Sequence, residues 1–152
     1  MQIFTYLTEH EVHVIAQAAN QPGLVANRLH STCQVFSDRA LRSRHLAYGL
    51  IPEPVDPLVE QQRLVFRYAY AEIFEQLNIE SMASGELSAL SPGISAASIV
   101  GLFSEILVGP FNQLSAQSVK CTEPLLFTQT GQSSVSEFIT LACQLVGLEP
   151  PK

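Results

Sequence analysis

The chain has 152 residues, of which 47% are hydrophobic and 14% are charged. This length fits one domain with a substantial buried core, and the apolar content argues against wholesale disorder. The charged fraction lies well below the typical value of about a quarter, and the net charge is −6. Because neutralising phosphates needs a dense positive face, the composition excludes a uniformly cationic nucleic-acid-binding protein.

The charges are unevenly distributed along the chain. All six arginines lie within residues 28–67, whereas residues 68–152 hold eight acids and only two lysines. Such asymmetry permits electrostatic complementarity between copies of the chain or with a partner. The alternative is that the uneven distribution does not affect binding to copies or partners, because physiological salt screens interactions between charges beyond about 8 Å.

The cysteines and the N-terminal segment indicate a soluble protein of a reducing compartment. Cys33, Cys121 and Cys143 form no C-x-x-C pair, and an odd number cannot all pair within one chain. Residues 1–7 lack the basic region of a secretory signal, and the most apolar run, 99–108, is shorter than the roughly 20 residues that cross a bilayer. We therefore expect a cytoplasmic location, or a place within a particle assembled inside the cell, and no membrane span.

Two helices are predicted in the first third of the chain. Thr8 and Glu11 form a capping box that predicts a helix start at Thr8, and the breaker Gln21-Pro22-Gly23 ends that helix near Asn20. A second helix follows Gly23, with a new cap permitted at Ser37-Asp38. Its apolar stripe consists of Val25, Leu29, Cys33, Phe36 and Ala40.

A proline-rich connector over 48–57 precedes the longest predicted helix. Asp56 is its expected N-cap and Pro57 its first residue. Its core stripe is predicted to be Val59, Phe66, Tyr70, Ile73 and Leu77, widened by Leu58, Val65 and Ala69. The aromatic side chains Phe66, Tyr68, Tyr70 and Phe74 predict that this helix is the centre of packing.

The rest of the chain is predicted to contain a loop, two helices and a short edge strand. The loop covers 81–93, and an apolar helix covers 94–108 before Gly109-Pro110. Residues 117–128 permit an edge strand pairing with 3–7. A second capping box at Ser134 opens a helix that ends at Gly147, with Phe138, Leu141, Ala142, Leu145 and Val146 inward. The expected fold is a mainly α, single-domain bundle of about five helices over 1–152, with room for a small two-stranded sheet.

No pattern of residues predicts a catalytic or metal site. His10-Glu11-Val12-His13 is one residue short of the zinc signature His-Glu-x-x-His, so two exposed polar residues are the favoured interpretation. His30 and Cys33 lie three apart on one helix, but Cys33 belongs to the apolar stripe, which favours buried packing over a thiolate. Nucleotide-binding and nucleophile-elbow motifs are missing from the sequence. We therefore assign no catalytic residue, no metal and no cofactor.

The densest group of cations is Arg39, Arg42, Arg44 and His45. One interpretation is a contact for phosphate or for an acidic protein surface. The other is a solvated face that the acidic second half compensates.

Residues 7–41 resemble an F-box, a helical hairpin whose motif ends in Val-Cys-x-x-Trp/Phe. Leu7-Thr8 stands at the Leu-Pro position of that motif, and the segment from Thr32 to Phe36 matches its later part. The resemblance implies that Leu7, Ile15, Leu29, Cys33 and Phe36 serve packing and docking to a Skp1-type adaptor. The motif's proline is replaced by Thr8, and the match covers under a quarter of the chain.

The low charge content favours a protein whose surface is covered by neighbours, since interface cores are poor in lysine and glutamate. We expect a non-enzymatic structural subunit of a larger assembly, such as a virus or phage particle, acting through self-association or other protein partners. The candidate contact residues are Arg39, Arg42, Arg44, His45, Leu29 and Phe36, together with the apolar helix 94–108. The alternatives are an F-box-like adaptor and an enzyme of a type that no motif identifies.

Overall fold

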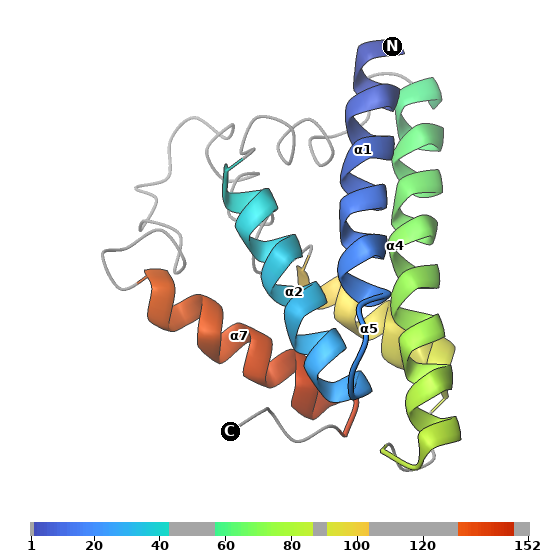
Figure 1. The fold of residues 1–152 in the computed structure, drawn as a ribbon. Coiled ribbons are helices and arrows are strands. Elements are labelled where there is room, and N and C mark those ends of the chain that lie inside the picture. Colours follow the sequence, from blue (N-terminus) through green and yellow to red (C-terminus); the bar gives the residue numbers. More distant parts are fainter. Residues whose placement is uncertain (1, 43–56, 87–90, 104–130, 148–152) are drawn as a thin grey trace.

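The computed structural model describes residues 2–42, 57–86, 91–103 and 131–147, and this part of the chain is a bundle of five α-helices without strands (Figure 1). The mainly α prediction is therefore confirmed. The helices are α1 (Gln2–Ala19), α2 (Val25–Arg42), α4 (Pro57–Ser84), α5 (Pro92–Phe103) and α7 (Gly131–Leu145).

The α1 and α2 helices form an antiparallel hairpin, and α4 runs beside α1 in the same direction (Figure 1). The α5 helix packs against the C-terminal half of α4, where Asn78 Nδ2 donates to the Pro92 carbonyl across 3.4 Å. The α7 helix packs mainly against α2. The N-terminal turns of α1 and α4 therefore extend past the end of α2 (Figure 1).

A cluster of aromatic rings joins four of the five helices. The Phe103 ring of α5 lies 4.3 Å from Phe36, 5.7 Å from Phe74 and 4.8 Å from Phe138, measured between ring centroids. Tyr70 meets Phe36 edge to face at 5.2 Å. Since buried aromatic side chains remove large apolar areas from water, this cluster fixes α2, α4, α5 and α7 against one another.

The predicted start of the first helix is wrong. The α1 helix begins at Gln2, so Thr8 lies inside it with a fully buried side chain, and residues 3–7 form helix instead of a strand. Glu11 is not the capping partner of Thr8, because its carboxylate accepts hydrogen bonds from Arg39 of α2. The contacts of α1 with α2 and α4 thus override the local capping signal.

The α2 helix continues through the break permitted at Ser37-Asp38. The Ser37 hydroxyl donates to the Cys33 carbonyl across 2.9 Å, and Gln34 donates to Asp38 across 3.0 Å. Both polar side chains are therefore satisfied within the helix, and neither caps a new one.

The α4 helix starts at Pro57 as predicted but runs to Ser84, so the predicted loop over 81–93 is too long at both ends. Gly85, at φ +78°, donates to the Met82 carbonyl, and the Glu86 N–H donates to the Ser81 carbonyl across 2.9 Å. These two bonds form a Schellman motif that ends the helix. Asp56 and the connector over 48–56 lie outside the described residues.

The burial pattern of α4 differs from the prediction on one side. Phe66, Tyr70, Phe74 and Leu77 are buried, as expected. Val65 is 53% exposed, and Tyr68, which we placed in the packing centre, is 71% exposed. Both lie in the first half of α4 and stay exposed with the other described helices in place.

The last two described helices begin earlier than predicted. The α5 helix starts at Pro92, two residues before the expected start, and Gly109-Pro110 and 117–128 lie outside the described part. The α7 helix starts at Gly131 and is followed by Gly147 at φ +76°, the expected terminator. The prediction that Leu141 and Leu145 point inward is wrong, since both are 43% exposed. The buried face of α7 consists of Val135, Phe138, Ile139, Ala142 and Cys143, and Val146 is buried directly after the helix.

Candidate functional site

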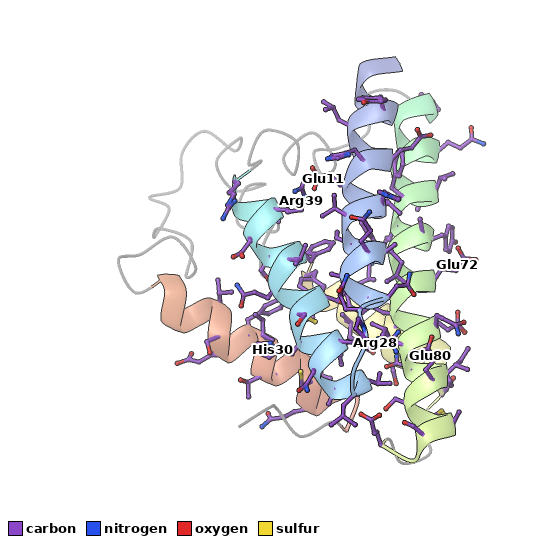
Figure 2. The ribbon with its side chains drawn as sticks, viewed as in Figure 1. Glu11, Arg28, His30, Arg39, Glu72 and Glu80 are labelled. Carbon is purple, nitrogen blue, oxygen red and sulfur yellow. The ribbon has the colours of Figure 1, made fainter. Side chains whose placement is uncertain are left out.

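The predicted cation cluster is divided by the fold. The Arg39 guanidinium donates twice to the Glu11 carboxylate, with 2.6 Å between Nη2 and Oε1, and so joins α2 to α1 (Figure 2). The hydrogen bond to Glu11 raises the pKa of Arg39 above its ordinary value, although partial burial opposes this shift. Arg42 is exposed at the C-terminus of α2. Arg44 and His45 lie outside the described residues. Of the two members that the structure describes, Arg39 is paired within the bundle and Arg42 is exposed.

The candidate docking residues Leu29 and Phe36 lie inside the bundle. Leu29 is fully buried, and Phe36 packs on Phe103 and Tyr70. Their neighbour Cys33 is also fully buried. Burial is the main cause that raises the pKa of its thiol, and the nearby Cys143 raises this pKa as well. The F-box-like stripe of α2 thus supplies core packing in this chain.

The histidines of α1 face solvent. His10 and His13 are exposed, and His13 shares a hydrogen bond of 3.0 Å with Gln17. Within the described ranges, no three His, Cys, Asp or Glu side chains are grouped as metal ligands. Cys33 is fully buried in the core and His30 is half-buried, so the two do not form an exposed reactive pair.

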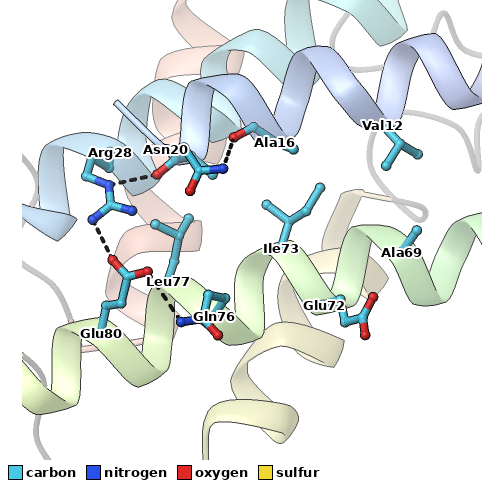
Figure 3. Close-up of a pocket in the computed structure, with 11 residues that line it drawn as sticks. Val12, Ala16, Asn20, Arg28, Ala69, Glu72, Ile73, Gln76, Leu77 and Glu80 are labelled. Carbon is cyan, nitrogen blue, oxygen red and sulfur yellow. Dashed lines mark hydrogen bonds and ion pairs between the residues drawn. The ribbon is translucent and has the colours of Figure 1, made fainter. Parts of the chain in front are cut away.

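A groove of about 410 Å³ lies between α1 and α4 (Figure 3). Its floor is made of small and apolar side chains, because Val12 and Ala16 of α1 lie beside Ala69, Ile73 and Leu77 of α4. The remaining lining residues are Ala19, Asn20, Arg28, Glu72, Gln76 and Glu80. Alanines at this seam let the two helices pack closely and leave a shallow depression above them.

Arg28 closes one end of the groove by joining three elements. Its Nε donates to the Ala19 carbonyl across 2.7 Å, and its Nη1 donates to Glu80 Oε2 across 2.6 Å (Figure 3). The bond to Arg28 lowers the pKa of Glu80, with a smaller contribution from Gln76. At the rim of the groove, Glu72 pairs with no described cation, so its charge faces solvent.

The outer side of the first half of α4 carries exposed apolar side chains. Leu64 is 39% exposed, Val65 53% and Tyr68 71%, with exposed Arg67 and Glu72 beside them. We call these five residues the outer strip of α4. On neighbouring α1, Tyr6 and Leu7 are also exposed. Sequence periodicity missed the outer strip because an apolar position on a long helix looks the same whether or not a neighbour covers it. Such a strip is typical of a surface that meets another protein.

Comparison of the chain with protein-family models, with curated proteins and with solved structures finds no match. Among the described helices, none has the combination of length and apolar character that crossing a membrane requires.

Proposed function

We propose that the protein is a non-enzymatic structural subunit of a larger protein assembly, acting through contacts on its weakly charged surface. The observation that carries this proposal is the exposure of Val65 and Tyr68 on the outer strip of α4, together with that of Tyr6 on the neighbouring helix α1. Exposed tyrosine and branched aliphatic side chains on adjacent helices have the composition of an interface core.

The charge content supports the same function. Only 14% of the residues are charged, so few charges remain to keep an apolar surface soluble in isolation. Two of the arginines, Arg28 and Arg39, are engaged in ion pairs within the bundle. Covering the outer strip with a neighbouring protein removes the cost of exposing its apolar side chains to water.

The proposal is tested on the chain in its native source. Gentle lysis, chemical cross-linking and native electrophoresis measure the mass of the particle that contains it. We expect a particle several times heavier than the 16.6 kDa chain. A chain that migrates alone at its native concentration, with and without cross-linking, would rule out the structural role.

A further inference from the structure

We propose, building on the function above, that the outer strip of α4 binds a second copy of this chain. The two α4 helices then lie side by side in parallel about a two-fold axis, with Leu64 and Tyr68 of each copy at the seam. The occupant of the strip is thus the same strip of another molecule.

The spacing of the strip fits a seam between two helices. Leu64 and Tyr68 are four residues apart, which is the interval between a d position and the following a position of a heptad pattern. Leucine suits a d position in a parallel pair of helices. Tyr68, at 71% the most exposed of the large hydrophobic side chains described on α4, supplies the type of residue that dominates binding energy at interfaces.

The fold leaves this part of α4 open. The helix has 28 residues and is therefore about 42 Å long. The α5 helix begins at the level of Glu75, whose carboxylate lies 3.2 Å from the position that a Cβ on Gly93 would take. On the opposite side, Tyr70 and Phe74 face the core. Leu64, Val65 and Tyr68 keep exposed fractions of 39%, 53% and 71% with the other described helices in place, so these helices leave the outer strip uncovered.

The charged residues Arg67 and Glu72, which flank the outer strip, favour pairing with a second copy whose α4 helix runs parallel. In the heptad that places Tyr68 at a, Arg67 occupies g and Glu72 the following e. The two are five residues apart, about 140° around the helix, and form no ion pair with each other. In a parallel pair, residues at g meet residues at the following e of the partner helix. Each Arg67 therefore faces Glu72 of the other copy, and the strip is complementary to itself.

Sedimentation equilibrium of the purified full chain over a concentration series tests the contact. We expect a reversible dimer that Tyr68→Glu weakens at least about tenfold, because the charge enters the seam. Ile94→Glu is the matched control, since Ile94 is equally exposed at 70% but lies on α5. A wild-type monomer at all soluble concentrations, or a dimer that Tyr68→Glu leaves intact, would overturn the proposal. Circular dichroism checks that each variant is folded.

Charge reversal tests the self-complementarity. Arg67→Glu and Glu72→Arg should each weaken the dimer several-fold, because each places like charges opposite one another. The double variant restores opposite charges across the seam, so its dissociation constant should return towards that of the wild type. If the losses of affinity of the two single variants add up in the double variant, the pairing of Arg67 with Glu72 of the other copy is contradicted. A partner of another kind would not carry the matching charge reversals, so it could not restore the affinity.

Cross-linking tests the orientation. In a Cys121→Ser background, Leu64→Cys should form an interchain disulfide on mild oxidation, because equivalent residues meet in a parallel pair. A dimer that fails to cross-link at Leu64 would contradict the parallel arrangement. If the purified chain is monomeric yet belongs to a large native particle, the self-pairing is wrong and the structural function stands. If the native chain is also alone, both are wrong.

Discussion

Glu86 accepts a hydrogen bond of 3.1 Å from the backbone N–H of Ala26, although 60 residues separate them. The same carboxylate accepts a hydrogen bond of 3.3 Å from the Val25 N–H, so it caps the N-terminus of α2 from the end of α4. The Schellman turn at Gly85 places it there, and the Ser84 hydroxyl holds one of its oxygens across 2.9 Å. A helix end is thus completed by a residue remote in sequence.

This cap predicts that Glu86→Ala lowers the free energy of unfolding by about 1 kcal/mol, as the loss of an N-cap does in other helices. Glu86→Gln should cost less, because its amide oxygen still accepts a hydrogen bond. Urea denaturation followed by circular dichroism measures both variants. Exposed Glu9→Ala is the control, and a loss as large as that of Glu86→Ala would remove the capping explanation.

Two carboxylates make stability depend on pH. The bond from Arg28 lowers the pKa of Glu80. Partial burial alone would raise the pKa of Glu86, but the hydrogen bonds from Ala26, Ser84 and Val25 outweigh it and lower the pKa. A carboxyl group with a depressed folded-state pKa contributes stability above its unfolded value of about 4.3, and this is lost as the pH falls through the folded pKa.

We therefore expect the melting temperature to fall between about pH 5 and pH 3, as the two carboxylates are protonated. The double variant Glu80→Gln, Glu86→Gln should be less stable than the wild type at pH 7 and should show a flatter dependence over the same range. Differential scanning calorimetry across the pH series measures both. An unchanged slope in the double variant would assign the acid sensitivity to other groups.

The sequence predicted those features of the fold that depend on local chemistry. The start of α4 at Pro57 and the end of α7 before Gly147 follow from the backbone preferences of proline and glycine. The start of α1 could not be predicted, because Thr8 and Glu11 have the spacing of a cap and only the fold gives Glu11 its partner on α2. The contacts of α1 with its neighbouring helices therefore override the capping signal of Thr8 and Glu11.

The candidate site was harder to predict than the fold. Arg39 looked available as part of a cation cluster, yet the acid that binds it lies 28 residues away. Leu29 and Phe36 lie on an apolar stripe, and a stripe that faces the core has the same sequence pattern as one that docks a partner. Conversely, Tyr68 looked like core because periodicity shows the side of a helix and not which neighbours reach it. Tertiary packing decides all of these cases.

The ion pair between Arg39 and Glu11 predicts different effects for two arginines of α2. Arg39→Glu should lower the free energy of unfolding by about 1–2 kcal/mol, because it places two carboxylates together where Glu11 is half-buried. Arg42→Glu, on the exposed last turn, should cost only about 0.5 kcal/mol through the helix dipole. Urea denaturation measures both. Equal losses would indicate that Arg39 is as solvated as Arg42.

Two buried serines form a matched test of hydrogen-bond satisfaction. Ser37 and Ser81 are both fully buried within helices, and the Ser37 hydroxyl donates to the Cys33 carbonyl. The Ser81 hydroxyl finds no hydrogen-bond partner among the described residues, so it has lost hydration without compensation. Ser81→Ala removes this uncompensated group and raises helix propensity, so the free energy of unfolding should rise by about 1 kcal/mol.

Ser37→Ala removes a hydrogen bond that is already made, and this loss offsets any gain in helix propensity. The free energy of unfolding should therefore stay within about 0.5 kcal/mol of the wild-type value or decrease. Guanidinium denaturation at pH 7 gives the difference between the two variants directly. The expected order is Ser81→Ala above wild type, with Ser37→Ala at or below it. If Ser81→Ala destabilises the protein, its hydroxyl has a partner in solution, and a buried water bridging Ser81 to the unpaired Oδ1 of Asn78 then becomes the explanation to test.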